Sequence, residues 1–207
     1  MAKRKKILWL ASWYPNKYDP FDGDFIQRHA KAAALFDDIH VIFVKESKQQ
    51  SAIEEEWNYC DGLTEQIIYF PKPKSVLSKL KSYRQWQALF KRAVNAYCEK
   101  ELPSIVHVQV PWKAGIIAIW IKKKYKIPFF ITEHWGIYNR IVPDNIHTKS
   151  LPFRYLLKRI YKAALAFISV SKYLGESVSL ELIKKKYIVI PNVVDTLLFQ
   201  PSSNKYS

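Results

Sequence analysis

The sequence predicts an α/β fold in one domain, with a parallel sheet and helices on both of its faces. Short apolar runs of strand length alternate along the 207 residues with longer stretches in which apolar residues recur at helical spacing. Several runs are apolar throughout, which is typical of strands buried on both faces of a parallel sheet. No Gly- or Ser-rich linker divides the chain, and its 49% hydrophobic content is enough for one sizeable core.

The first half of the chain begins with a short apolar run at 7–11. This run follows four basic residues, but it is too short for a secretory signal or a membrane span, so we interpret it as a buried strand. Asp61-Gly62 is a strong two-residue turn signal, which places a hairpin across 54–70. The other elements predicted here are a helix at 25–36, a strand at 39–44 and a helix at 77–100, whose apolar and basic residues lie on opposite sides.

The second half repeats the alternation of strand and helix. Its predicted strands are 105–110, 129–132, 166–170 and 188–190, and its predicted helices are 113–125, 152–163 and 173–185. Pro191 has no N–H for a sheet ladder, so the last strand ends there. In an open parallel sheet, ligands bind outside the carboxyl ends of the strands, so we expect functional residues in the loops that follow each strand.

Composition limits the function. Cys60 and Cys98 are the only cysteines and neither has a metal-ligand spacing, so we expect free thiols in a reducing cytoplasm and no metal site. The net charge is +15, and residues 72–162 hold 19 Lys or Arg against four acidic residues. Such clustering indicates an anionic partner, which could be nucleic acid, anionic lipid or a phosphorylated substrate, although a merely solvated basic surface is the alternative.

The loop at 12–24 is long for a connection between a strand and a helix, which suggests a binding loop. It holds one glycine, Gly23, where a dinucleotide fingerprint would need Gly-x-Gly-x-x-Gly directly after the strand. Gly23 at the start of a helix suits the binding of a phosphate group. The alternative is that Gly23 only permits the turn and that Asp24 caps the helix.

A second candidate loop is Thr132-Glu133-His134-Trp135-Gly136. His134 follows the end of a predicted strand, with Glu133 before it and Gly136 leaving space, and these features favour a catalytic role. The alternative is a structural histidine. We interpret His40 and His107, in predicted strands, as structural, and His29, on the apolar face of the first helix, as a core or cleft-wall residue.

Aromatic and polar residues follow other strands. Trp112, Trp135, Asn139 and Arg140 are candidates for binding a sugar-bearing anion, because aromatic faces stack on sugar rings and Arg binds phosphate. The alternative is ordinary loop packing. Ser171 is placed to cap the helix after it, and no Gly-x-Ser-x-Gly motif surrounds it that would indicate a hydrolase nucleophile.

The end of the chain carries a resemblance to a known family. The strand that leads into Pro191-Asn192-Val193-Val194-Asp195, with Phe199 and Pro201 after it, resembles the interdomain crossover of the family-four glycosyltransferases. These enzymes have the GT-B fold, in which two Rossmann-like domains face each other across a cleft. The long first loop, Asp22-Gly23 in the place of the family's Gly-Gly pair, and Thr132-Glu133-His134 fall in the order that the family has.

The resemblance covers nearly the whole chain and implies a domain organisation. Residues 1–200 are expected to form a Rossmann-like N-terminal, acceptor-side domain, which is the N-terminal half of a GT-B fold. Residues 201–207 are expected to begin an interdomain linker or a disordered tail, with the C-terminal donor-binding domain absent. The isolated chain is then expected to be inactive, and the missing domain is its expected partner.

The resemblance also implies an activity, which is transfer of a sugar with retention from a nucleotide-sugar donor to an envelope glycan or lipid-linked acceptor in bacterial polysaccharide biosynthesis. No metal ion and no cofactor are expected. His134 is the expected catalytic residue, near the transferred sugar. The expected substrate-binding residues are Asp22, Gly23, Trp112, Glu133, Trp135, Asn139, Arg140 and Ser171, and the expected hinge residues are Asn192 and Asp195.

A cytoplasmic location is expected, with peripheral attachment to the inner face of the cell membrane through the basic helix at 77–100. Trp86 and Phe90 of that helix are explained equally well as core residues. Two other functions stay open at this point: a basic nucleic-acid-binding protein and a non-catalytic Rossmann-like interaction domain. No helix-turn-helix, zinc-finger or RNA-recognition signature is present, so no nucleic acid is expected as a partner.

Overall fold

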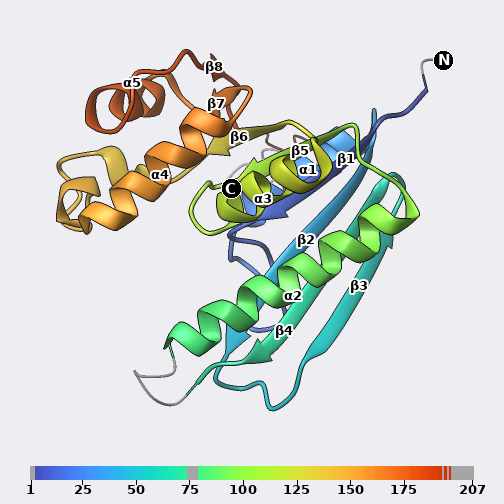
Figure 1. Ribbon diagram of the computed structural model, residues 1–207. Helices are drawn as coiled ribbons and strands as arrows, with labels where there is room; N and C mark the ends of the chain where they lie inside the picture. Colours follow the sequence, from blue (N-terminus) through green and yellow to red (C-terminus); the bar gives the residue numbers. More distant parts are fainter. Residues whose placement is uncertain (1–2, 74–78, 193, 195, 197–207) are drawn as a thin grey trace, which may run out of the picture.

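The structure, a computed structural model, describes residues 3–73, 79–192, 194 and 196. It confirms the α/β fold, with one eight-stranded sheet in the order β3-β4-β2-β1-β5-β6-β7-β8 (Figure 1). Neighbouring strands are parallel except for β3 and β4. The strands are β1 (Lys6–Ala11), β2 (Asp38–Ser47), β3 (Glu54–Cys60), β4 (Leu63–Pro71), β5 (Ile105–Gln109), β6 (Phe129–Glu133), β7 (Phe167–Ser169) and β8 (Ile188–Val189). The helices are α1 (Asp24–Ala34), α2 (Lys79–Lys100), α3 (Ala114–Tyr125), α4 (Leu151–Ala163) and α5 (Lys172–Glu181), with short 3-10 turns η2 (Gly136–Tyr138) and η3 (Ile146–Thr148).

Helices cover both faces of the sheet, as predicted. Along β1, Leu8 and Leu10 face the larger core, which also holds residues of α2, α3, α4 and α5. Trp9 and Ala11 of the same strand face the smaller core, which holds residues of α1. Successive side chains of a strand point to opposite faces, so the apolar run of β1 fills both cores.

Some predicted boundaries are wrong. The first helix ends at Ala34, and Phe36, predicted on its apolar face, is 76% exposed. The Arg4 side chain donates hydrogen bonds to the carbonyls of Ala34 and Asp37, and so satisfies the end of the helix just before β2 begins. The predicted helix at 173–185 ends at Glu181.

The structure confirms the interpretation of Trp86 and Phe90 on α2 as core residues. Trp86 and Phe90 are 7% and 0% exposed and belong to the larger core, and α2 lies across β2, β4 and β3 in Figure 1. The helix therefore uses its apolar side to cover the sheet. Leu80, predicted on that side, is 60% exposed, and Leu77 lies outside the described residues.

The order of the strands determines where a ligand site is expected. β1 pairs with β2 on one side and with β5 on the other, so the connections that follow β1 and β5 leave the sheet at the point where the strand order reverses. Crevices form at such points outside the carboxyl ends of the strands. In the part of the chain that the structure describes, no helix is both long and apolar enough to cross a bilayer. Cys60 and Cys98 are free, as predicted.

Candidate active site

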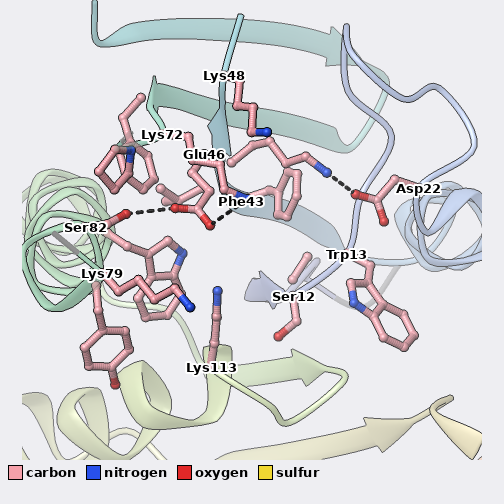
Figure 2. Close-up of a pocket in the computed structure, with 17 residues that line it drawn as sticks. Ser12, Trp13, Asp22, Phe43, Glu46, Lys48, Lys72, Lys79, Ser82 and Lys113 are labelled. Atoms are coloured by element: carbon pink, nitrogen blue, oxygen red, sulfur yellow. Dashed lines mark hydrogen bonds and ion pairs between the residues drawn. The ribbon is translucent and has the colours of Figure 1, made fainter. Parts of the chain in front are cut away.

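A cavity of about 880 Å³ opens at the carboxyl ends of β1, β2 and β4, beside the first turns of α2 and α3 (Figure 2). We refer to it as the strand-tip cavity. Its walls combine aromatic rings, cations and two acids. The aromatic residues are Trp13, Phe43, Phe70, Tyr83 and Trp86; the cations are Lys45, Lys48, Lys72, Lys79 and Lys113; and the acids are Asp22 and Glu46.

The strand-tip cavity carries an excess of positive charge. Lys45 Nζ lies 2.6 Å from Asp22 Oδ2, and Ser82 Oγ donates to Glu46 Oε2 at 2.8 Å. Among the described residues, no acidic group lies within ion-pair distance of three other cations that line the cavity: Lys48, Lys79 and Lys113. Figure 2 shows the Lys79 and Lys113 side chains entering the cavity from its α2 side and its α3 side. A cavity with such walls favours an anionic ligand.

The loop after β5 holds Lys113 in a rare backbone conformation. Lys113 has φ 62° and ψ −65°, and Ala114 N donates to Trp112 O at 2.8 Å, which defines a classic γ-turn. Val110 in the same loop has φ 60°, which is unusual for a β-branched residue. Ser12 Oγ donates to Val110 O at 2.7 Å and accepts from Ala114 N at 3.3 Å. The first loop thus braces a strained turn, which places Lys113 in the cavity wall.

His134 lies where the sequence predicts, directly after β6. Its Nε2 is 3.0 Å from Gln109 Oε1, and its ring centre is 4.6 Å from that of Phe25 and 5.7 Å from that of His29. Burial, with a smaller effect from His29, lowers the pKa of His134 to about 3, so the ring is neutral. A neutral ring that donates through Nε2 leaves Nδ1 as an acceptor, and Nδ1 is buried without a hydrogen-bond partner among the described residues.

His134 does not line the strand-tip cavity but is connected to its wall through two tryptophans. The ring of Trp135, next to His134, meets the ring of Trp13 edge to face, with centroids 5.9 Å apart. Trp13 in turn lines the cavity. On the other side of His134, His29 Nε2 lies 3.2 Å from Asn192 Oδ1, so the predicted hinge residue Asn192 contacts this group. Asp195, the other predicted hinge residue, lies outside the described residues.

Glu133 lies beneath this loop and not in the cavity. It is 0% exposed and accepts four hydrogen bonds, from His134 N at 3.0 Å, Trp135 N at 2.9 Å, and the hydroxyls of Tyr138 and Tyr161 at 2.7 and 2.8 Å. Burial outweighs these bonds and raises the pKa of Glu133 to about 6. The carboxylate of Glu133, a predicted substrate-binding residue, has no exposed surface and instead fixes the backbone of His134 and Trp135.

Asp22 and Gly23 lie at the end of the first loop. Asp22 lines the strand-tip cavity and pairs with Lys45. Gly23 is the N-cap of α1 with φ 68°, and a Cβ atom there would lie 2.8 Å from the backbone carbon of Trp13. Only glycine fits this left-handed conformation so close to another main chain. The alternative in which Asp24 caps the helix is wrong, because its carboxylate pairs with Arg28 at 2.9 Å.

The remaining predicted substrate-binding residues make structural contacts. The ring of Trp112 packs on that of Phe153, with centroids 4.3 Å apart. Ser171 Oγ accepts from Leu174 N at 3.1 Å and so caps α5, as predicted. None of these residues, nor Asn139 or Arg140, lines the strand-tip cavity.

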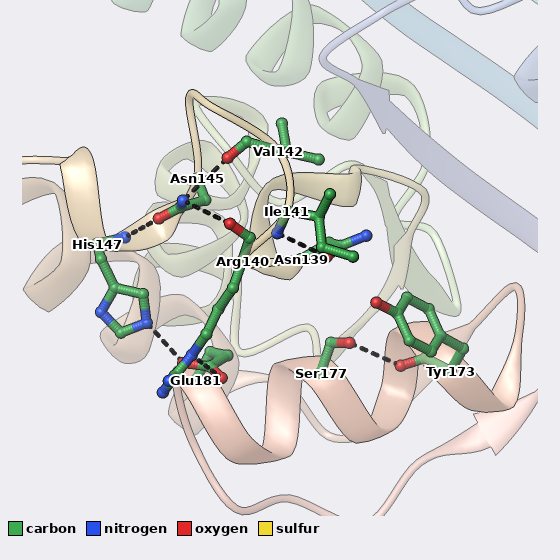
Figure 3. Close-up of polar contacts among 9 residues, drawn as sticks. All are labelled: Asn139, Arg140, Ile141, Val142, Asn145, His147, Tyr173, Ser177 and Glu181. Carbon is green, nitrogen blue, oxygen red and sulfur yellow. Dashed lines mark hydrogen bonds and ion pairs between the residues drawn. The ribbon is translucent and has the colours of Figure 1, made fainter.

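Asn139 and Arg140 belong to a separate polar cluster. Arg140 Nε and Nη2 donate to the two carboxylate oxygens of Glu181 at 2.8 and 3.1 Å, and His147 contacts the same carboxylate (Figure 3). Asn139 Oδ1 accepts from Ile141 N at 3.0 Å. These bonds attach the loop after η2 to α5. The guanidinium of Arg140 is thereby already paired with a carboxylate.

Sequence reasoning missed several cations of the strand-tip cavity. Lys45 and Lys48 follow the apolar run at 39–44, which is a predicted strand. Because ligands bind outside the carboxyl ends of strands, this position could have identified both lysines as candidates. Lys79 and Ser82 have no such signal, because only the packing of α2 on the sheet brings its first turns to this edge. Among the described residues, no three His, Cys, Asp or Glu side chains are grouped so that they could hold a metal ion.

A mostly parallel sheet covered by helices on both faces, with a cavity at its strand tips beside the reversal of strand order, defines a Rossmann-like ligand-binding domain. The family model of Glycosyltransferase Family 4 matches residues 28–197, and the chain belongs to this family. A search of curated protein sequences found no match.

Solved structures share the fold. Alpha,alpha-trehalose-phosphate synthase (UDP-forming) from Burkholderia vietnamiensis aligns with a TM-score of 0.56 and 9% identity, over 86% of this chain and 42% of that chain. Arabidopsis thaliana UGT89C1 complexed with UDP aligns with a TM-score of 0.51 and 10% identity, over 93% and 50% of the two chains. Glycyrrhiza uralensis UGT73P12, complexed with glycyrrhetinic acid 3-O-monoglucuronide, aligns with a TM-score of 0.50 and 12% identity, over 85% of this chain and 45% of that chain. The Rossmann-like fold is therefore that of GT-B glycosyltransferases, and this chain spans about half the length of these structures or less.

Proposed function

We propose that the chain forms the acceptor-side domain of a two-domain enzyme that transfers a sugar, with retention, from a nucleotide-sugar donor to an envelope glycan or lipid-linked acceptor. Membership of Glycosyltransferase Family 4 supports sugar transfer. The observation that carries the assignment of the acceptor is the strand-tip cavity, whose volume of about 880 Å³ and mixed aromatic and cationic walls suit a sugar that bears phosphate.

Three lysines of the strand-tip cavity would bind the anionic group of the acceptor. Lys48, Lys79 and Lys113 face the cavity without an acidic partner among the described residues, so a ligand phosphate would be their counter-charge. The aromatic ring of Trp13 would pack against the acceptor sugar. A lipid-linked sugar phosphate or diphosphate has both features.

His134 would act by hydrogen bonding and not as an acid. With its pKa lowered to about 3 the ring is neutral and a poor general acid, and this half-buried ring would make a hydrogen bond with a hydroxyl of the transferred sugar. Glu133 would position this ring through the two backbone N–H groups that it binds. We therefore assign His134 to contact with the substrate and Glu133 to positioning.

The leaving diphosphate of the donor develops negative charge, which positioned N–H groups and cations can stabilise. The first turn of α1 behind Gly23 would supply N–H groups to it. The family resemblance implies catalysis without a metal ion or a further cofactor. The main donor-binding groups would belong to a second, C-terminal domain, in keeping with the 42–50% of the solved structures that this chain spans. The chain by itself is expected to turn over no donor.

The basic side of α2 would bring the protein to the anionic inner face of the cell membrane, where a lipid-linked acceptor is found. Because Trp86 and Phe90 are buried in the core, this attachment would be electrostatic, with no apolar insertion by α2. Co-sedimentation with vesicles tests it: recovery should be greater with anionic than with neutral vesicles. Equal recovery with both would exclude the attachment.

The activity is tested on the proposed two-domain enzyme, with this chain as its acceptor-side domain. It is incubated with UDP-glucose, UDP-N-acetylglucosamine, GDP-mannose and dTDP-rhamnose in turn, and the release of nucleoside diphosphate is measured with water as a slow acceptor. One donor should release its nucleotide, and His134→Ala should slow that release by about 10²-fold. The matched control is His147→Ala, which changes an exposed histidine that contacts Glu181 of α5. Release by no donor, or equal release by wild type and His134→Ala, would contradict the proposal.

A further inference from the structure

A second cavity, of about 380 Å³, lies on the α2 face of the sheet but at the opposite end of the parallel strands. We refer to it as the amino-end cavity. Its floor crosses three strands, because the sheet register places His40 beside Thr64, Thr64 beside Tyr59, and Gln66 beside Trp57. The last turns of α2 form its wall. The strand-tip cavity adjoins the first turns of α2, so the two cavities are separate.

The amino-end cavity has an aromatic platform. Trp57 and Tyr59 alternate along β3, so their side chains share one face, and their rings are nearly parallel at 9° with centroids 6.2 Å apart. They are 40% and 74% exposed, although β3 is an edge strand on which such side chains invite aggregation. The ring of His40 meets that of Trp57 edge to face, with centroids 5.8 Å apart, and the exposed parts of the Trp57 and Tyr59 rings remain accessible to a ligand.

Polar groups surround this platform, and two ion pairs cancel most of their charge, which leaves Lys100 as a lining cation without an ion pair among the described residues. Arg92 forms an ion pair with Glu55, and Lys6 forms one with Glu101. Gln66 Nε2 donates to Glu55 Oε2 at 3.1 Å. The strand-tip cavity, by contrast, has a clear excess of cations. An anionic ligand thus has little to gain here, whereas a neutral ligand with hydroxyl groups finds donors and acceptors in place.

Five residues of α2 line the cavity, and two of them have small side chains. The five are Arg92, Ala93, Ala96, Tyr97 and Lys100. Ala96 is exposed, so a larger side chain there would occupy part of the cavity. The two alanines thus leave room on the α2 side of the cavity.

We propose that the amino-end cavity binds an uncharged hexose unit of a glycan chain. One face of the sugar ring stacks on Trp57 and Tyr59, and its hydroxyls bond to Thr64, Gln66 and the Arg92–Glu55 pair. A sugar ring fits these observations because it combines apolar C–H faces with a polar rim and no charge. The site lies away from His134, so it holds a glycan without taking part in transfer.

Binding is measured with the 207-residue chain and linear neutral hexasaccharides, namely maltohexaose, cellohexaose, laminarihexaose and mannohexaose, by tryptophan fluorescence and by amide chemical shifts. One of them should bind saturably and shift the signals of Trp57 and Tyr59. Tyr59→Ala should weaken binding about threefold to tenfold, since a stacked aromatic contributes about that much. Ala96→Leu, which fills the cavity and keeps both rings, should weaken it at least as strongly.

Tyr155→Ala is the matched control, because Tyr155 is a 65% exposed tyrosine on α4, outside the cavity, and its variant should bind as wild type does. The proposal is overturned if none of the four sugars binds, or if Tyr59→Ala and Ala96→Leu bind like wild type. It is also overturned if light scattering shows a dimer that Tyr59→Ala disperses, since the platform is then an interface between copies. No donor is used, so the result is independent of the proposed sugar transfer.

Discussion

The substitution Glu133→Gln tests the structural role of a fully buried carboxylate. A carboxyl of this kind has a pKa of 4.5 when solvated, and burial raises that of Glu133 to about 6, so the folded protein binds more protons between these pH values. Its contribution to stability is fully present below about pH 4.5 and is lost as the pH rises through about 6. The difference between the two pKa values corresponds to about 2 kcal/mol.

Glutamine keeps the shape of the side chain and does not titrate. Its carbonyl can accept from the N–H groups of His134 and Trp135, and its amide can donate to the hydroxyl oxygens of Tyr138 and Tyr161. The free energy of unfolding is measured by urea titration of both proteins from pH 4.5 to 7.5. Relative to Glu133→Gln, the wild type should be about 2 kcal/mol more stable at pH 4.5 than it is at pH 7.5. A difference that is constant with pH, or that grows as the pH rises, would refute this reasoning.

Three further predictions concern Gly23 of the first loop, His134 and α2. Gly23→Ala should lower the free energy of unfolding by about 1–2 kcal/mol, because φ is 68° at this position. The control Gly136→Ala should change it by less than about 0.5 kcal/mol, because no atom lies within 4 Å of the added Cβ. Equal melting temperatures of the two variants would contradict this prediction. The ring proton signals of His134 should not titrate by NMR between pH 5 and 8, because its pKa is lowered to about 3, and a midpoint near 6.5 would show a solvated ring. Phe90→Ala should lower the free energy of unfolding by about 3–5 kcal/mol, because the Phe90 side chain is 0% exposed. Phe36→Ala should lower it by less than about 0.5 kcal/mol, because Phe36 is 76% exposed. Similar losses of stability in the two variants would place α2 outside the core.

Much of the fold could be predicted because its signals are local. The apolar run at 7–11, the Asp61-Gly62 turn and the helical spacing at 152–163 each correspond to an observed element, namely β1, the β3–β4 hairpin and α4. The end of α1 could not be predicted, because Arg4, some 30 residues earlier in the chain, satisfies its last carbonyls. The packing direction of α2 also stayed open, since an apolar side that covers a sheet has the same spacing as one that lies on a membrane.

Part of the candidate site could also be predicted, because its position follows from the predicted strands. The carboxyl-end rule located His134 and the first loop, because that rule follows from the direction of the strands. It could not show that Glu133 is fully buried, since two of its four donors, Tyr138 and Tyr161, reach it only in the folded protein. Nor could it show that Arg140 is already bound to Glu181, which is 41 residues away in the sequence.

The central claim is that the strand-tip cavity binds the anionic part of a substrate. It is tested most directly by titrating the chain with inorganic pyrophosphate and following backbone amide signals by NMR. The signals of Trp13, Ser82 and Lys113 should shift saturably, those of Trp57 should not, and Lys113→Gln should weaken binding whereas the exposed control Lys123→Gln should not. Shifts confined to residues outside the cavity, or equal binding by Lys113→Gln and Lys123→Gln, would contradict the claim.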